Sequence, residues 1–230
     1  MAEILHITHE AGDLSEYTST VTDSGDLSVD VTSTLVGSYG LLCTIDDTNN
    51  IYGLKSFTTL TSTVFRWRLY FDPNTITATN GVEFATIFKV MNSTSDRVVL
   101  TTRKRADGSG YDTRLRVYTD VGNNTTSYYN ILDAPNYIEG NVVYASSDVA
   151  SDATASLWVN GSLQETLTGL DIFDLTKPNT IRAGALGVAA ATSGSYFVDD
   201  IILRDDNTQI GAAAAATTIL PQIMHHYYGS

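Results

Sequence analysis

Two stretches of the chain repeat the pattern Arg-x-Arg-x-Tyr, and both are predicted to be β-strands. Alternate residues of a strand point to the same side, so each repeat projects two guanidinium groups and a phenol from one face. Arginine forks bind carboxylates through paired hydrogen bonds, and tyrosine rings offer a stacking surface. If the two strands share a sheet, the repeats form a basic, aromatic patch for an acidic glycan or an acidic protein partner. The alternative is a solvated face balanced by nearby Asp. The patch residues are Arg66, Arg68, Tyr70, Arg114, Arg116 and Tyr118.

Residues 194–206 place two adjacent carboxylates in an otherwise apolar stretch. Its aromatic and β-branched residues, bounded by Gly and Asp, predict a strand. Strict alternation puts Asp199 on the face of Ile201 and Leu203, and Asp200 on the opposite face. A buried carboxylate is costly unless it is hydrogen-bonded, ion-paired or bound to a cation. Another part of the chain must therefore satisfy this pair.

Residues with common catalytic chemistry are present but are not grouped along the chain. The six Glu are isolated, and no Ser/His/Asp spacing suggests a triad. Cys43 is the only cysteine and has apolar neighbours, which indicates a buried thiol rather than a nucleophile. We therefore predict no catalytic residues and no enzymatic activity. The isolated residues are Glu3, Glu10, Glu16, Glu83, Glu139 and Glu165, with His6, His9, His225 and His226 near the chain ends.

The elements that position these groups are predicted to be strands. Thr, Ser, Val, Tyr and Gly are frequent while Lys and Glu are few, which favours strands joined by turns over helices. The clearest strand is 63–71, where Phe65, Trp67, Leu69 and Phe71 alternate with Arg and Tyr. Strands recur about every ten residues with turn signals between them. We predict an all-β fold, a single antiparallel β-sandwich with little or no helix.

Charge and hydropathy disfavour several classes of partner. The formal net charge is −13, yet nine of the 13 basic residues lie between Arg66 and Arg116 with only five of the 26 acidic residues. A strongly negative total disfavours nucleic acid, and no apolar stretch is long enough to cross a membrane. No secretory signal peptide is visible at the N-terminus. The uneven charge is expected to decide which surface meets which partner.

Three segments in the last third of the chain occur in the order of a known family. A strand with an Asn-Gly turn (156–163), an Arg-Ala-Gly strand (181–187) and the strand with the Asp pair (194–203) resemble concanavalin A-like, laminin-G-like jelly rolls. The resemblance covers nearly the whole chain. It departs at Asn160, where Asp is usual, and at Tyr17, where Trp is common. It implies a jelly-roll, lectin-like sandwich.

The resemblance also has implications for ligands and activity. Members of the family often hold a structural calcium between the N-terminal segment and the last strand, which implicates Glu10 with Asp199 or Asp200. Calcium takes roughly six to eight oxygen ligands and would neutralise a buried acid; the alternative is an Asp that accepts hydrogen bonds from backbone amides. Glucan-cutting enzymes of this fold carry Glu-x-Asp-x-x-Glu, which is absent here. Lyases of similar fold use Arg, His and Tyr of the concave sheet, and here every His lies near a chain end.

Residues 211–230 depart from the jelly-roll pattern and are predicted to form a C-terminal arm on a domain of residues 1–210. The apolar, aromatic arm is expected to bury itself in an assembly. Together with the composition and the missing signal, it predicts a non-enzymatic structural protein of a phage virion, a capsid decoration or tail component that contacts its own copies or other virion proteins. The alternative is a secreted or surface carbohydrate-binding module, located outside the cell. The predicted assembly residues are Ile219, Leu220, Ile223, Met224, Tyr227 and Tyr228.

Overall fold

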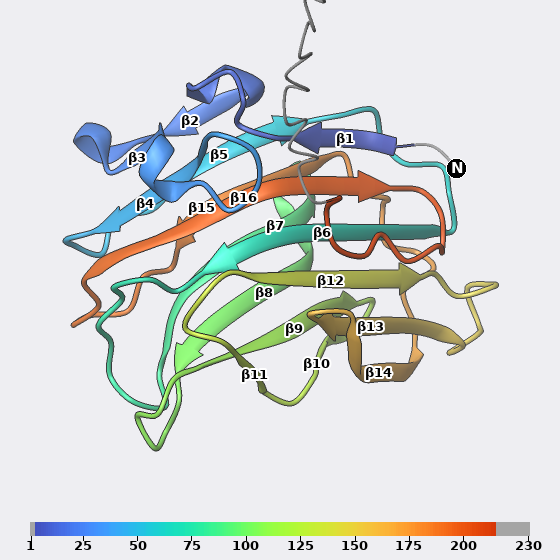
Figure 1. Ribbon diagram of the computed structural model, residues 1–230. Coiled ribbons are helices and arrows are strands. Elements are labelled where there is room, and N and C mark those ends of the chain that lie inside the picture. The colour runs from blue at the N-terminus through green and yellow to red at the C-terminus, as the bar shows by residue number, and fades with distance from the viewer. Residues whose placement is uncertain (1–2, 215–230) are drawn as a thin grey trace, which may run out of the picture.

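Two antiparallel sheets face each other in the computed structural model, which describes residues 3–214 (Figure 1). The predicted all-β sandwich is confirmed. Within the described residues there is no α-helix, and no helix is long and apolar enough to span a membrane. The helical turns are the short 3-10 segments η1 (Leu14–Glu16), η2 (Asp23–Gly25) and η3 (Val31–Ser33).

Sheet A holds both the first and the last strand of the described chain. Its order is β14-β13-β12-β6-β16-β4-β3, and β1 pairs with the second half of β16 while β4 pairs with the first half. In Figure 1, β16, β6 and β12 cross the front of the molecule side by side. The strands are β1 (Glu3–Ile7), β3 (Leu27–Asp30), β4 (Gly40–Ile45), β6 (Val64–Asp72), β12 (Asn136–Val143), β13 (Ala153–Val159), β14 (Ser162–Leu170) and β16 (Gly194–Arg204).

Sheet B lies behind sheet A in this view, in the order β10-β9-β8-β7-β15-β5-β2, with β11 paired to β9. Its centre is a hairpin in which β7 and β8 pair across a tight turn. The strands are β2 (Ser19–Val21), β5 (Ile51–Ser56), β7 (Glu83–Asn92), β8 (Ser95–Lys104), β9 (Tyr111–Thr119), β10 (Gly122–Thr125), β11 (Tyr129–Ile131) and β15 (Thr180–Leu186).

The core lies between the sheets and is built around β6. The Trp67 ring reaches Phe88 of sheet B, with 5.2 Å between ring centroids. On the neighbouring strand β12 a side chain at Gly140 would lie 2.3 Å from the Trp67 ring, so only glycine fits there. Burial of four large side chains stabilises the fold by about 6–12 kcal/mol before ordering entropy is subtracted. These four side chains, each at most 1% exposed, are Phe65, Trp67, Leu69 and Phe71.

A β-bulge in β16 changes the predicted alternation. Asp200 has a positive φ of 46°, and the pairing with β6 shifts between Asp199 and Ile202. Because the bulge adds one residue, the side chains of Ile201 and Leu203 lie in the core, whereas that of Asp199 does not. The prediction that these three side chains share one face is therefore wrong. The chain instead keeps its apolar residues inside and sends both carboxylates towards polar partners.

Residues 205–214 fold back over the outer face of sheet A, and we call this segment the strap. Glu139 accepts hydrogen bonds from the backbone N–H groups of Ile210 and Gly211, at 2.8 and 3.0 Å. The Tyr70 hydroxyl accepts one from the N–H of Ala213, at 2.8 Å. The strap thus places the first residues of the predicted arm against the domain.

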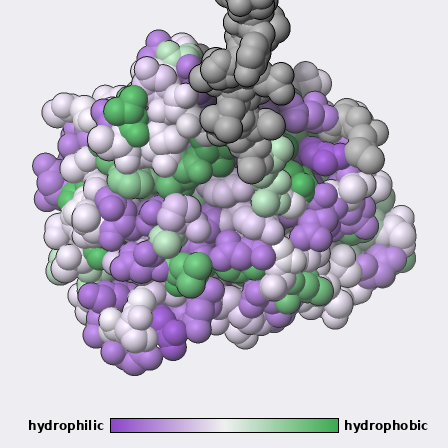
Figure 2. Space-filling model, viewed as in Figure 1, coloured by the Kyte–Doolittle hydropathy of each residue, from purple (hydrophilic) through white to green (hydrophobic). Residues whose placement is uncertain are grey.

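The surface in this view is largely polar with small separate apolar patches (Figure 2).

Candidate functional site

The two Arg-x-Arg-x-Tyr repeats lie on opposite sheets. The first is on β6 of sheet A, and the second is on β9 of sheet B. Inside each repeat, the apolar residues that alternate with the arginines and tyrosine, such as Leu69 and Leu115, point into the core. The arginines and tyrosines of the two repeats therefore face outward and away from each other. The single patch predicted for strands of one sheet therefore does not form. Each repeat has its own surroundings.

The sheet A repeat is buried under the strap. Arg66 and Arg68 are only 3% and 2% exposed. Arg66 pairs with Glu139, while Arg68 pairs with Asp200 and donates a hydrogen bond to the carbonyl of Gly211 at 3.1 Å. Each guanidinium thus has its own buried carboxylate. In the described part of the chain, this repeat leaves no exposed cation for a ligand.

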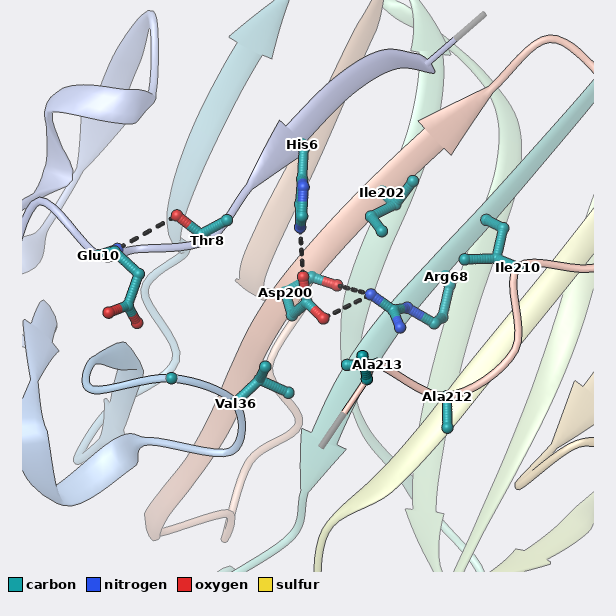
Figure 3. A pocket seen from close by; sticks show the side chains of 12 residues that line it. His6, Thr8, Glu10, Val36, Arg68, Asp200, Ile202, Ile210, Ala212 and Ala213 are labelled. Atoms are coloured by element: carbon teal, nitrogen blue, oxygen red, sulfur yellow. Dashed lines mark hydrogen bonds and ion pairs between the residues drawn. The ribbon is translucent and has the colours of Figure 1, made fainter. Parts of the chain in front are cut away.

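A cavity of about 370 Å³ lies beside the strap, over β1, β6 and β16 (Figure 3). On one wall the Asp200 carboxylate is held by both His6 and Arg68. The hydrogen bond with Asp200 raises the pKa of His6, although burial and the charge of Arg68 oppose the shift. The charged side chains on this wall therefore satisfy one another. The other lining residues are mainly apolar or small and include Val36, Gly37, Ile202, Ile210 and Ala212.

The carboxylates assigned to calcium by resemblance are engaged by protein donors. Glu10 accepts backbone hydrogen bonds from Ser38 and Tyr39 at 2.8 and 3.2 Å, and the bond from Ser38 lowers its pKa most. Asp200 is paired with Arg68, which would repel a second cation. Among residues 3–214, no group of three or more His, Cys, Asp or Glu side chains is placed to hold a metal. The residues in this arrangement do not fit calcium, which stays a prediction for chelation to test.

Asp199, His9 and Tyr17 form a buried relay of hydrogen bonds that the sequence did not indicate. The Asp199 carboxylate accepts hydrogen bonds from the N–H groups of Leu35 and Val36, at 3.0 and 2.8 Å, and lies 3.1 Å from His9 Nδ1. The other ring nitrogen of His9 lies 3.0 Å from the Tyr17 hydroxyl. His9 and Asp199 are 190 residues apart in the chain, so spacing gave no signal for their contact. The relay is closed to solvent and ties the N-terminal segment to the last strand.

The sheet B repeat contributes to a cluster around Glu83, at the start of β7. Glu83 Oε1 accepts hydrogen bonds from Arg114 Nε at 2.6 Å, and from the Thr101 and Tyr128 hydroxyls at 2.7 Å each. Arg116 Nη2 lies 3.9 Å from Glu83 Oε2. Burial alone raises the pKa of Glu83, but the hydroxyl donors and the charge of Arg114 outweigh it and lower the pKa. Glu83 is therefore ionised at neutral pH.

The Tyr128 ring lies against two guanidinium groups. The guanidinium carbon of Arg103 is 3.5 Å from the ring centroid, and that of Arg114 is 4.6 Å away. Burial and the hydrogen bond to Glu83 raise the pKa of Tyr128 to about 12, so its hydroxyl keeps its proton at neutral pH. A cavity of about 320 Å³ adjoins the ring and is lined by Arg103, Arg105, Ala106, Asp107, Asp112, Tyr128 and Asn130.

A row of opposed residues extends the basic surface across sheet B. In the strand register Arg182 faces Lys89, Lys89 faces Val99, and Val99 faces Arg116. Opposed residues of antiparallel neighbours project to the same side, so three cations lie along a line of about 14 Å. We call this surface the arginine face. Its cationic and aromatic members are Tyr52, Lys89, Arg103, Arg114, Arg116, Tyr118, Tyr128 and Arg182.

Most of the arginine face was not predicted as a site. The sequence singled out Arg114, Arg116 and Tyr118, and it showed a surplus of basic residues in the middle of the chain. It did not point to Glu83 or Tyr128, because the side chains that meet at Glu83 come from residues 18, 31 and 45 positions away in the chain. The signal that could have found the face was the charge surplus together with the β7–β8 hairpin. The predicted assembly residues, from Ile219 to Tyr228, lie outside the described residues.

No protein-family model matches the chain, and no curated protein matches it in sequence. Several solved structures are similar to it. The endo-β-1,4-glucuronan lyase of the fungus Trichoderma reesei has a TM-score of 0.62 at 9% identity, over 88% of this chain and 95% of that one. The alginate lyase Aly36B has a TM-score of 0.59 at 10% identity, over 91% and 98%. The binding domain of botulinum neurotoxin serotype G has a TM-score of 0.58 at 14% identity, over 90% and 49%. These similarities show a jelly-roll sandwich, consistent with the concanavalin A-like prediction.

The comparisons contradict two predictions from the sequence. The similar folds include polysaccharide lyases, so the prediction of a non-enzymatic structural protein is wrong, as is the prediction that the protein is not an enzyme. A virion role has no support among them. Along the chain no acids or triad residues are grouped, and every His lies near a chain end. The fold nevertheless brings Glu83, Arg114 and Tyr128 together from β7, β9 and the segment between β10 and β11.

Proposed function

We propose that the protein is carbohydrate-active and that its arginine face binds an anionic polysaccharide, such as a polyuronate. The observation that supports this most is the position of Arg116. Its guanidinium is partly exposed and, within residues 3–214, has one ion contact at 3.9 Å and no hydrogen bond. A guanidinium with free N–H donors on an open face can bind a sugar carboxylate through two parallel hydrogen bonds.

The charge of the arginine face supports the same ligand class. Five cationic side chains lie on it, while its acids are Glu83, Asp96 and Asp112. The chain as a whole carries a formal net charge of −13, so this face differs in sign from the rest of the molecule. A local basic surface attracts a polyanion even when the total charge is negative. The similarity to a glucuronan lyase and an alginate lyase supports an acidic rather than a neutral polysaccharide.

A panel of polysaccharides tests this function. We expect the protein to bind polyglucuronate or alginate but not an uncharged β-glucan, and we expect added salt to weaken the binding because screening acts on exposed charges. Replacement Arg116→Ala should reduce the affinity about tenfold, which corresponds to about 1.4 kcal/mol. The matched control is Arg204→Ala, since Arg204 pairs with Asp206 on the other sheet. Equal binding of charged and uncharged polymers, or no binding at all, would contradict the proposal.

Cleavage of the bound polymer by β-elimination is a second candidate function, favoured by the groups around Glu83. Elimination removes the proton at C5 of a uronate, breaks the bond from C4 to the leaving oxygen, forms the C4–C5 double bond and returns a proton to that oxygen. It uses a cation on the carboxylate, a base and an acid. Arg116 is a cation whose ion contact with Glu83 is long, at 3.9 Å, Glu83 is ionised, and Tyr128 holds its proton.

The product of elimination has a distinctive ultraviolet absorbance. Incubation of the protein with polyglucuronate and with alginate should produce that absorbance, and Tyr128→Phe should abolish it while leaving polymer binding in place. Tyr129→Phe is a suitable control, because Tyr129 bonds to Glu165 and not to Glu83. If polymers bind but no unsaturated product forms, the protein is a binding module without lyase activity.

A further inference from the structure

Glu83 occupies the place on the arginine face where an anionic ligand would meet the most donors. Its carboxylate has hydrogen bonds from Arg114, Thr101 and Tyr128 and an ion contact with Arg116. Its side chain is 28% exposed, so the group lies at the surface rather than in the core. The protein therefore already holds one carboxylate in a set of donors that suits a carboxylate.

Resting on the proposed function, we infer that Glu83 is a built-in counter-ion that competes with the polysaccharide for the arginines of sheet B. A ligand anion at Arg116 approaches the Glu83 carboxylate and is repelled by it. The competition sets a minimum charge density for binding, because a polymer with closely spaced charges makes enough additional contacts to overcome the repulsion. Glu83 thereby selects polymers of high charge density over sparsely charged ones.

The two arginines next to Glu83 are held unequally, which is what this role requires. Arg114 is tightly bound to Glu83, at 2.6 Å, and its guanidinium also lies against the Tyr128 ring. Among the described residues, Arg116 has a single ion contact, with Glu83 at 3.9 Å. A ligand can therefore bind Arg116 without breaking the hydrogen bond between Arg114 and Glu83. Loss of the Glu83 charge releases both guanidinium groups to the ligand.

The surroundings of Glu83 contain the groups that affect its charge. Strand β8 contributes Thr101, and also Arg103, which lies against the Tyr128 ring. Strand β9 contributes Arg114 and Arg116. Asp112 of β9 pairs with Arg103 and offsets that cation. The pKa of Glu83 is lowered, so its counter-ion role persists at neutral pH and ends as the pH falls through that lowered value. Sulfate esters, which are strong acids, stay ionised there.

The test compares Glu83→Gln, which keeps the shape and removes the charge, with Asp206→Asn as matched control. Asp206 pairs with Arg204 on sheet A, so its replacement changes the net charge equally but away from the arginine face. We expect Glu83→Gln to bind polyglucuronate about tenfold more tightly, by removal of one repulsive charge pair. We expect Asp206→Asn to bind as the wild type does. The gain should be larger for a sparsely charged polymer than for a dense one.

The outcomes separate this inference from the proposed function. If the wild type binds and Glu83→Gln binds no more tightly, the counter-ion role is wrong and the proposed function stands. If neither protein binds any polyanion, both are wrong. If Glu83→Gln binds more tightly yet loses elimination activity, Glu83 acts as counter-ion and base together, and the inference holds.

A pH titration of the wild type keeps the inference testable if Glu83→Gln fails to fold. Affinity for dextran sulfate should rise as the pH falls through the pKa of Glu83, because the ligand keeps its charge and the competitor loses its own. Where Glu83→Gln does fold, most of this rise should be absent from it. A flat profile in the wild type would overturn the counter-ion role.

Discussion

The two Arg-x-Arg-x-Tyr repeats have the same spacing, one on β6 of sheet A and one on β9 of sheet B, yet their surroundings give them opposite roles. On sheet A, Arg66 and Arg68 each have a buried carboxylate partner and lie under the strap. On sheet B, Arg114 and Arg116 share a single Glu83 on an open face. A repeat with one buried partner for each cation stabilises the fold. A repeat with fewer partners than cations is available to bind a ligand.

The largest effect is expected from loss of the buried Glu139 carboxylate on sheet A. Glu139→Ala should destabilise the protein by about 3–5 kcal/mol, because it leaves Arg66 buried without its partner and two strap N–H groups without an acceptor. Chemical denaturation measures the change. Glu83→Ala, the equivalent replacement on the open face, should cost about 1 kcal/mol or less. A loss at Glu139 no larger than that at Glu83 would remove the distinction between the faces.

Replacement of one arginine from each repeat should separate the effect on binding from the effect on stability. Arg116→Met should weaken polyglucuronate binding about tenfold and change the free energy of unfolding by about 0.5 kcal/mol or less. Arg68→Met should do the reverse, because Asp200 then stays buried without that cation while the arginine face is intact. Binding titrations and denaturation of both variants check the pattern. Weakened binding in Arg68→Met would place the ligand on sheet A instead.

A smaller effect concerns the pH dependence of stability at the sheet A cavity. The hydrogen bond with Asp200 raises the pKa of His6 above its value in the unfolded chain. The stabilisation by His6 is therefore complete below the unfolded pKa of about 6.5 and is lost as the pH rises through the folded pKa. The melting temperature should fall by a few degrees over that window. In His6→Gln this part of the decline should be absent, and an unchanged decline would assign it to other groups.

The smallest expected effect is that of metal removal. Glu10, Asp199 and Asp200 have protein donors, so a chelator should leave the melting temperature unchanged. A decrease that added calcium reverses would restore the calcium prediction. Scanning calorimetry with and without chelator measures this directly, with magnesium as the control for a nonspecific ionic effect.

Much of the fold was predictable because the core strands alternate clearly. Phe65 and Trp67 correctly indicated the inward face of β6. The bulge at Asp200 was not predictable, since strict alternation of faces assumes that no residue is inserted. The candidate site depended on which strands become neighbours, and local residue patterns do not determine that. The same limit concealed the strap, whose partner Glu139 is 71 residues away in the chain.

Amide chemical-shift mapping with oligoglucuronate locates the binding surface directly. We expect shifts concentrated on β7, β8, β9 and β15, with the largest near Arg116 and Glu83 and little change on β6, β12 and β16. The matched titration of Arg116→Ala should show the same pattern at higher ligand concentration. Shifts centred on sheet A, or none on either sheet at saturating ligand, would show that the arginine face does not bind the polymer.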